Sequence, residues 1–398
     1  MSPPLELEVA QARLLAHAAL LPIERMPASE ALGRYLAEPL IARRTQPPAN
    51  LSAMDGFAVR EADLPGPWRV IGESACGHPY TGSLGRGEAV RIATGALLPS
   101  GCDRVVLQEN CQRDGGQLAL TRPVGAARHI RTTGMDFSAG RELLPTGARL
   151  GPAQIGLAIT AGHRLIAVRR PVKLTIIDTG NELASDPEVC AIHQIPASNG
   201  AMLAAMAAAL PCQISHGPPV PDRLEAIVAA FESAADADVI VTSGGASVGD
   251  HDLLRPALER WGAELDFWRV AIKPGKPLLV ARKGQTLVLG LPGNPVSSHV
   301  TAYLFLLPLL RTLLGASAPL PRPIAALLNA DMAAVGERRE FIRAQWDGKV
   351  VVPLHNQDSG ALATLAASNA LIERPAGCGL ATAGTVVPVY LLENGGIA

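Results

Sequence analysis

Between residues 172 and 314 the sequence alternates short apolar runs with windows of helical periodicity, and this alternation restricts the fold more than any other feature. The runs at 172–178, 238–243 and 286–291 are rich in Val, Ile and Leu, as expected of strands buried on both faces. One helical window has apolar residues at i, i+3, i+4 and i+7, namely Leu224, Ile227, Val228 and Phe231. Strands that alternate with helices predict a doubly wound, mostly parallel sheet.

Further elements are expected around these strands and in the two flanking regions. Additional strands of the sheet are expected at 213–220 and 264–272, and a long helix at 297–314. Residues 1–168 start with short helical patterns and carry, between about 48 and 140, alternating runs with frequent Gly and Pro turns, which predict an inserted β-rich domain. Residues 322–398 are again short alternating runs, typical of a small β-barrel or sandwich. We therefore expect an α/β and β multidomain chain divided at 1–168, 169–318 and 322–398.

The composition excludes several classes of function. With 48% hydrophobic residues and a net charge of −1, the chain is typical of soluble globular proteins, and we expect neither a nucleic-acid nor a membrane partner. The six cysteines show no CxxC spacing and are expected to be reduced thiols. The N-terminal segment carries Glu6 and Glu8 where a secretion signal has basic residues. The apolar stretch 301–310 is interrupted by Pro308 and is too short to cross a bilayer, so we expect a cytoplasmic protein.

Four loops that follow predicted strands form the candidate site. In an open parallel sheet, ligands bind outside the carboxyl ends of the strands. The loops there are 176–183, 242–252, 272–277 and 291–298, and their notable residues are Asp178, Glu182, Ser243, Gly244, Gly245, Ser247, Asp250, Asp252, Lys273, Lys276, Pro292, Gly293, Asn294 and Pro295. Carboxylates suit Mg²⁺, and lysines with glycine amides suit an oxyanion or phosphate. The sequence therefore indicates a phosphorylated ligand with its own metal ion.

Each loop also has an ordinary structural interpretation. A Gly-Gly pair is often only a turn, an acid after a strand often complements a helix N-terminus, and lysines are often solvated. The coincidence of four such loops in one sheet favours function. The segments 52–60 and 91–109 also end strands in polar turns, but their pattern does not tell whether they face the same crevice.

Six segments of the chain resemble motifs of a known family. SAMDGFAV, RIATGALLPSGCDRVVLQE, IDTGNEL, TSGGASVGDHD, IKPGKP and LPGNPVSS occur in this order. In this the chain resembles the MoeA-type molybdopterin molybdenumtransferases and is similar to the E domain of gephyrin, over essentially its whole length. The resemblance implies an elongated homodimer of four-domain subunits that inserts molybdate into adenylylated molybdopterin, with Mg²⁺-dependent release of AMP. Other partners that it implies are the molybdopterin adenylyltransferase and molybdoenzyme-maturation proteins.

The resemblance also implies roles for individual residues. The catalytic residues would be Asp55 and Thr94, both supplied by the partner subunit, with Glu182, Asp252, Lys273 and Lys276. The metal ligands would be Glu182, Asp250 and Asp252. The substrate-binding residues would be Arg131, Asp136, Ser243, Gly244, Gly245, Ser247, Asp250, Pro292, Gly293, Asn294, Pro295, Arg343 and Ser359. In this assignment the turn from Pro292 to Pro295 shapes the pterin pocket, and Arg343 and Ser359 lie near the molybdate.

The chain departs from the family pattern at six positions. Phe57 stands where the family usually has Tyr, Asp250 where it commonly has Glu, and acidic residues are replaced by Met135, Asn181, Ala197 and Pro221. Fewer carboxylates would weaken metal binding or alter the hydrolytic step. Two alternatives therefore stay open: a molybdopterin adenylyltransferase, whose fold the segment 172–315 resembles, and a non-catalytic pterin-binding scaffold.

Overall fold

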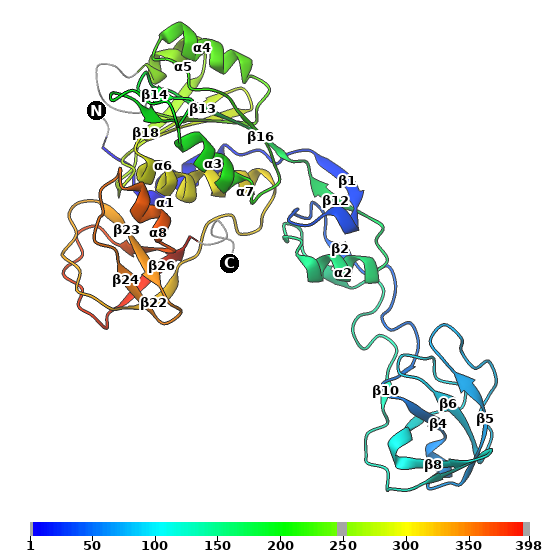
Figure 1. Ribbon diagram of the computed structural model, residues 1–398. Helices are drawn as coiled ribbons and strands as arrows, with labels where there is room; N and C mark the ends of the chain where they lie inside the picture. The colour runs from blue at the N-terminus through cyan, green and yellow to red at the C-terminus, as the bar shows by residue number, and fades with distance from the viewer. Residues whose placement is uncertain (1–2, 245–252, 393–398) are drawn as a thin grey trace.

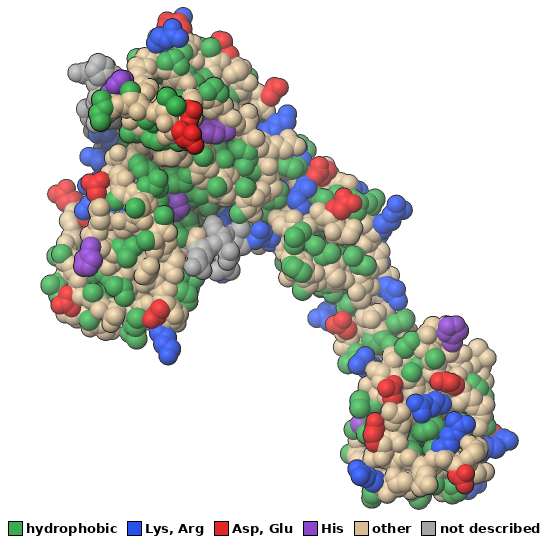
Figure 2. Space-filling model, in the orientation of Figure 1, with side chains coloured by type: hydrophobic (Ala, Val, Ile, Leu, Met, Phe, Trp, Pro, Cys, Tyr) green, Lys and Arg blue, Asp and Glu red, His purple; other side chains and the backbone are tan. Residues whose placement is uncertain are grey.

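The structure is a computed structural model that describes residues 3–244 and 253–392. Figure 1 shows an elongated molecule, with the α/β unit and the C-terminal β unit packed together at one end. A small connecting unit follows, and a β-rich unit formed by residues of the first third of the chain lies at the opposite end. On the face shown in Figure 2, acidic and basic side chains are interspersed over all of these units, in keeping with the net charge of −1.

The central sheet has six strands in the order β16-β13-β17-β21-β20-β18. Their bounds are β13 Val172–Asp178, β16 Cys212–His216, β17 Val239–Ser243, β18 Glu264–Arg269, β20 Pro277–Lys283 and β21 Thr286–Leu291. Strands β16, β13, β17 and β21 pair in parallel, whereas β20 is antiparallel to both of its neighbours. The prediction of a mostly parallel sheet is confirmed, and β20 is an antiparallel strand that the sequence pattern did not indicate.

Helices cover both faces of this sheet and create two separate cores. They are α3 Asn199–Ala207, α4 Leu224–Ser233, α5 Leu254–Trp261, α6 Pro295–Thr301 and α7 Leu307–Leu313, and a short parallel pair β14 Leu183–Ala184 and β15 Ile195–Pro196 lies between β13 and α3. The core on one face includes residues of α3, α6 and α7, and the core on the other includes residues of α4 and α5. Helix α1 (Leu7–Ala16) buries Leu7, Ala10 and Leu14 in the first core. The N-terminal helix therefore belongs spatially to the α/β unit.

The expected long helix runs from Pro295 to Leu313 without a break. The prediction of one helix over 297–314, with Pro308 inside it, is confirmed; a π-helical segment (Ala302–Leu306) precedes Pro308, so the regular hydrogen-bond pattern is already altered there. At 19 residues the helix is long and apolar enough to cross a membrane, so the expectation from the stretch 301–310 that it is too short was wrong, but 89% of its apolar 18-residue window is buried inside the protein. Its apolar side chains form the centre of the first core, with Leu304, Phe305 and Leu309 nearly inaccessible.

The connecting unit and the distal β-rich unit come from the first half of the chain. The connecting unit contains β1 Ile23–Pro27, β2 Leu40–Ile41, β11 Glu142–Leu144, α2 Pro152–Thr160 and β12 Leu165–Arg169. The distal unit has a six-stranded sheet of β4 Gly56–Val59, β5 Trp68–Ser74, β6 Glu88–Ile92, β7 Arg104–Leu107, β8 Cys111–Asp114 and β9 Gln117–Leu120. Strands β3 Leu51–Ser52 and β10 Ile130–Arg131 pair where the chain enters and leaves this unit. A β-rich inserted domain was predicted here.

The C-terminal unit is a closed barrel. Its elements are β22 Ile324–Leu328, β23 Arg339–Trp346, β24 Val350–Pro353, α8 Leu362–Ala367, β25 Ala370–Arg374 and β26 Val386–Leu391. The sheet closes because β23 pairs with both β24 and β25. A further strand, β19 (Ile272–Lys273), comes from the α/β unit and pairs in parallel with β23. The run predicted as one strand over 264–272 is therefore two strands in two different sheets.

Candidate functional site at the carboxyl edge of the sheet

Three of the four predicted loops lie side by side. Strands β13, β17 and β21 are neighbours in the sheet, and their last residues Asp178, Ser243 and Leu291 are in register. The amide of Gly244 donates to the carbonyl of Leu291 at 3.3 Å, and the amide of Thr179 donates to the carbonyl of Ser243 at 3.0 Å. The loops that follow these strands therefore start at one edge of the sheet, as a ligand site in this fold requires.

Asn199 links two of these loops, although it was not among the predicted site residues. Its side-chain amide nitrogen donates to Ser243 Oγ at 2.8 Å and to the carbonyl oxygen of Gly293 at 2.6 Å. Asn199 is the first residue of α3. In the sequence it is only a polar residue at the start of an Ala-rich helix, and no local pattern predicts its contact with two distant strand ends.

Gly244 is required by the close packing of the loops. It has a φ of +98°, and an added Cβ would lie 2.4 Å from the carbonyl oxygen of Thr179, so a larger residue would be strained and would clash. The remaining predicted residues of this loop, Gly245, Ser247, Asp250 and Asp252, lie outside the described residues.

The two predicted lysines lie between the α/β unit and the barrel. Lys273 belongs to β19, and its Nζ lies 2.8 Å from Glu340 Oε1 on β23. Lys276 is exposed and forms no ion pair within residues 3–244 and 253–392. Both lysines line a cavity of about 420 Å³ whose other polar residues are Ser297, Arg338, Glu340, Gln357, Asp358 and Ser359. The loop 272–277 thus contacts the C-terminal barrel at a polar cavity.

The turn from Pro292 to Pro295 is joined to the same region of the barrel. Asn294 donates from Nδ2 to Ser359 Oγ at 2.9 Å, and the amide of Val296 donates to the carbonyl of Ser359 at 3.1 Å. The structure therefore brings together predicted residues that are more than sixty positions apart in the sequence. Ser359 also lines the lysine cavity, so the turn and the lysines share one neighbourhood.

Arg343 binds the backbone of the loop 354–361, which carries Ser359 and is called here the Ser359 loop. It is 1% exposed, and its two terminal nitrogens donate to the carbonyl oxygens of Asp358 at 2.8 Å and of Asn356 at 3.0 Å. Burial lowers the pKa of this guanidinium. The Arg343 side chain thus binds backbone of its own barrel, and this geometry gives it a role in holding the Ser359 loop in place.

Glu182 is the exposed carboxylate of the loop after β13. Its side chain has no ion-pair partner in the part of the chain that the structure describes, and its backbone oxygen accepts from the amide of Ile195 at 2.8 Å. The adjacent Asn181 and Asp222 exchange two hydrogen bonds of 3.1 Å between side chains and backbone amides. Within the described residues no three His, Cys, Asp or Glu side chains are grouped as a metal site. Glu182 has hard oxygen donors of the kind Mg²⁺ prefers.

Asp55 and Thr94 lie together, but far from the sheet edge of their own chain. The amide of Thr94 donates to Asp55 Oδ1 at 2.6 Å, and the hydrogen bonds from Thr94 lower the pKa of Asp55, with a smaller effect from Arg91. Both residues belong to the distal β-rich unit, which Figure 1 places at the opposite end of the molecule from the α/β unit. Within one chain they do not join the site.

Arg131 and Asp136 lie on the exposed stretch that leaves the distal unit. Arg131 is in β10, opposite Leu51 of β3. The amide of Asp136 donates to the carbonyl of Gln46 at 3.1 Å. The structure does not bring these two residues to the sheet edge.

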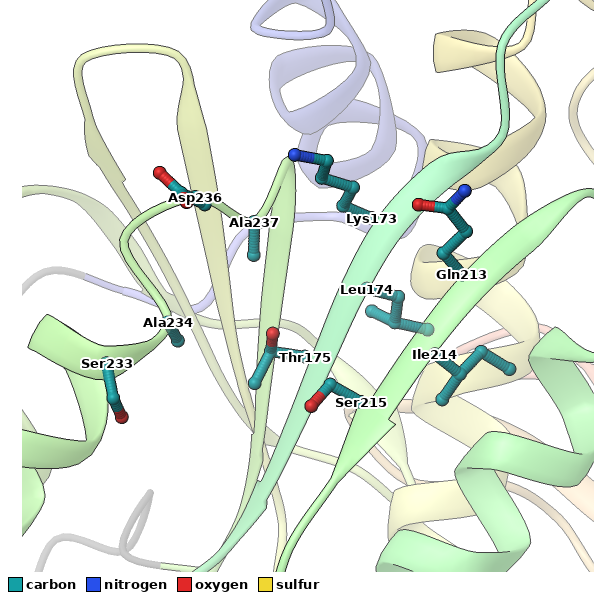
Figure 3. A pocket seen from close by; sticks show the side chains of 10 residues that line it. All are labelled: Lys173, Leu174, Thr175, Gln213, Ile214, Ser215, Ser233, Ala234, Asp236 and Ala237. Atoms are coloured by element: carbon teal, nitrogen blue, oxygen red, sulfur yellow. The ribbon is translucent and has the colours of Figure 1, made fainter.

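A second cavity, of about 250 Å³, opens beside strands β13 and β16 of the sheet. Figure 3 shows its lining, with Thr175 and Ser215 on neighbouring strands and Lys173 and Asp236 at one end. Ser233, the last residue of α4, completes its polar lining. None of the predicted site residues that the structure describes lines it, so the lysine cavity is the better candidate for ligand binding.

Comparisons with known proteins cover almost the whole chain. Three family models match in succession: the MoeA N-terminal region (domain I and II) at 5–162, a probable molybdopterin binding domain at 175–312 and the MoeA C-terminal region (domain IV) at 325–392.

Individual relatives agree with these matches. A molybdopterin molybdenumtransferase of Staphylococcus epidermidis is 31% identical, with 92% of this chain and 90% of that protein covered. One of Synechococcus elongatus is 36% identical, with 95% and 97% covered. The crystal structure of the molybdopterin biosynthesis MoeA protein from Pyrococcus horikoshii OT3 superimposes with a TM-score of 0.84 at 27% identity, over 98% of this chain and 100% of that one. The chain belongs to the MoeA family.

Proposed function

We propose that this chain is a molybdopterin molybdenumtransferase, which inserts molybdate into adenylylated molybdopterin and releases AMP in a Mg²⁺-dependent reaction. The observation that carries the proposal is the junction of the sheet edge with the barrel. There the two lysines and Ser359 line one polar cavity, and the turn from Pro292 to Pro295 is joined to it by the hydrogen bond from Asn294 to Ser359. Membership of the MoeA family supports the same reaction.

The lysines supply the charge that this reaction needs. Molybdate is a dianion, and it has to approach the phosphates and the thiolates of the pterin. Like charges repel strongly at short range where water is excluded. Lys273 and Lys276 line the cavity and would bind oxyanions through charge-assisted hydrogen bonds. Because the pterin provides the sulfur ligands, the protein needs no cysteine there, and no cysteine lines this cavity.

The metal ion would be held by Glu182 together with Asp250 and Asp252. Glu182 fits this role because its carboxylate is exposed and free of an ion pair among the described residues; the two aspartates lie outside them. Bound Mg²⁺ supplies positive charge that stabilises the negative charge on the pyrophosphate. In this proposal Ser243 and Gly244 lie beside the phosphates, and Asn294 shapes the wall on the pterin side.

The proposal includes a homodimer in the cytoplasm with an active site shared across subunits. Asp55 and Thr94 form one hydrogen-bonded unit at the far end of the molecule, so only a second copy of the chain brings them to the sheet edge. A molybdopterin adenylyltransferase would supply the substrate, and proteins that mature molybdoenzymes would receive the product.

A stopped assay for AMP tests the proposal. Purified protein with adenylylated molybdopterin and Mg²⁺ is expected to release AMP when molybdate is present, and Glu182→Gln is expected to reduce that rate at least tenfold. ATP-dependent adenylylation of molybdopterin by this chain would instead identify an adenylyltransferase. Tight pterin binding without turnover, unchanged by Glu182→Gln, would identify a scaffold.

A further inference from the structure

A buried carboxylate lies beside the proposed site and has an unusual set of partners. Asp178, the last residue of β13, is 1% exposed. Its Oδ2 lies 2.9 Å from His216 Nε2 and accepts from the amide of Gly200 at 3.2 Å, whereas its Oδ1 has no partner among the described residues. A carboxylate this deeply buried is costly unless a charged or polar group is held against it. His216 is the side chain that meets this need.

The three elements meet so closely here that only glycine fits on the helix. A Cβ added at Gly200 would lie 2.1 Å from His216 Nε2 and 2.2 Å from Asp178 Oδ2. The ends of β13 and β16 and the first turn of α3 are therefore packed at one point. Any other residue at position 200 would separate the helix from the Asp178–His216 pair.

Asp178 takes the place of a cap for this helix. The residue before α3 is Ser198, which has helical dihedral angles, and no side chain of α3 caps the helix start. The Asp178 carboxylate supplies both the acceptor for an N-terminal amide and the negative charge that stabilises a helix N-terminus. The position of the first turn of α3 therefore depends on Asp178, and the position of Asp178 depends on His216.

The residue that this arrangement fixes is Asn199. It directly precedes Gly200, and its amide bridges Ser243 Oγ at 2.8 Å and the carbonyl of Gly293 at 2.6 Å. Ser243 ends β17 and Gly293 follows β21, and both are predicted to bind substrate. A shift of the first turn of α3 would break the bridge and release the two loops from each other.

We propose that Asp178 and His216 are positioning residues of the active site, which act through Gly200 and Asn199 to set the spacing between the loops after β17 and β21. The inference rests on the proposed function, because those loops are taken to bind adenylylated molybdopterin. Neither residue touches the reacting atoms in this proposal. The pair therefore acts on substrate affinity more than on the chemical step.

The test compares His216→Ala with His216→Gln in full-length protein. The alanine variant is expected to raise KM for adenylylated molybdopterin about tenfold while kcat stays within about twofold, since one charge-assisted contact is lost. Glutamine keeps a nitrogen donor and is expected to recover most of the affinity. His193→Ala is the matched control, because His193 is an exposed histidine of the loop between β14 and β15, and it is expected to leave both constants unchanged.

A double variant separates positioning from general destabilisation. If His216 acts through Asn199, then Asn199→Ala and His216→Ala together should raise KM no more than Asn199→Ala does alone. A normal KM in His216→Ala, or effects of the two substitutions that multiply, would overturn the inference. If the wild type binds molybdopterin but releases no AMP, the proposed function fails, and the same comparison made on the dissociation constant for molybdopterin still decides the role of His216.

Discussion

Lys273 and Glu340 are ion-paired across two structural units, with Nζ of the lysine 2.8 Å from Oε1 of the glutamate. The same residues are partners in the backbone pairing of β19 with β23. The lysine is about half exposed and the glutamate is 22% exposed, so the pair contributes less than about 1 kcal/mol to stability. Its importance lies in the cavity that both residues line, where the carboxylate competes with any anionic ligand for the lysine.

The first prediction follows from this competition. Glu340→Gln is expected to lower the dissociation constant for AMP a few-fold at low salt, because the lysine loses its internal partner. The difference should shrink at high ionic strength, where charge interactions are screened. Titration calorimetry at two salt concentrations measures both effects. Glu337→Gln removes a charge from an exposed residue that forms no ion pair with the described part of the chain and should change little; equal effects of the two variants would contradict the prediction.

The second prediction concerns the shared active site. Asp55→Asn and Glu182→Gln are each expected to abolish most AMP release. After the two inactive proteins are mixed and allowed to exchange subunits, about one quarter of the wild-type activity should return, since half of the dimers are mixed and each has one intact site. The measurement is the rate of AMP release before and after exchange. No recovery, with exchange verified by native mass spectrometry, would place Asp55 and Glu182 in the same subunit's site or in separate processes.

The third prediction tests the packing at the start of α3. Gly200→Ala is expected to lower the free energy of unfolding by about 1–3 kcal/mol, because the added methyl group overlaps His216 and Asp178. Gly217→Ala is the control, since a Cβ there meets nothing within 4 Å, and its effect should stay within about 0.5 kcal/mol. Calorimetric unfolding of both variants checks this. A Gly200→Ala protein as stable as the wild type would show that the three elements separate at little cost.

The fourth prediction is a dependence of stability on pH that arises from one buried histidine. Burial lowers the pKa of His299 to about 4, and its Nδ1 is buried without a partner among the described residues. In the unfolded chain the pKa is about 6.5, so between these values the unfolded state binds more protons and stability falls as the pH falls. The loss from this group should reach about 3 kcal/mol at pH 4 and should be absent above pH 7.

Urea unfolding at a series of pH values measures that dependence. His299→Gln is expected to flatten the stability profile between pH 7 and pH 4, whereas His355→Gln, at an exposed position, should leave its slope unchanged. A wild-type slope that survives in His299→Gln would assign the effect to other groups.

The sequence predicted the features that depend on local pattern. The runs 172–178, 238–243 and 286–291 correspond to strands of the central sheet in the structure, because strands buried on both faces are rich in Val, Ile and Leu. The loops after them meet because parallel strands end at the same edge of a sheet. The antiparallel strand β20 was not predicted. Its residues 277–283 follow a Pro/Gly turn, and no helix separates them from the next strand, β21.

Other features depend on tertiary contacts that no local pattern encodes. Lys273 was expected in a loop of the sheet, and its backbone pairs with the barrel through β19. Asn199 and His216 contact residues more than 35 positions away. In the sequence, Asn199 is a helix start and His216 is a residue near a Gly-Pro turn. Only the packing of α3 on the sheet brings them to the site.

The pairing of β19 with β23 couples the position of the barrel to the shape of the lysine cavity. Ile272 and Lys273 are joined by backbone hydrogen bonding to Arg339 and Glu340 of the barrel, yet the chain continues from them directly into β20 of the central sheet. A rotation of the barrel therefore either breaks this ladder or pulls Lys273 along with it. The width of the cavity therefore depends on the orientation of the barrel, although the barrel closes through its own strands without β19.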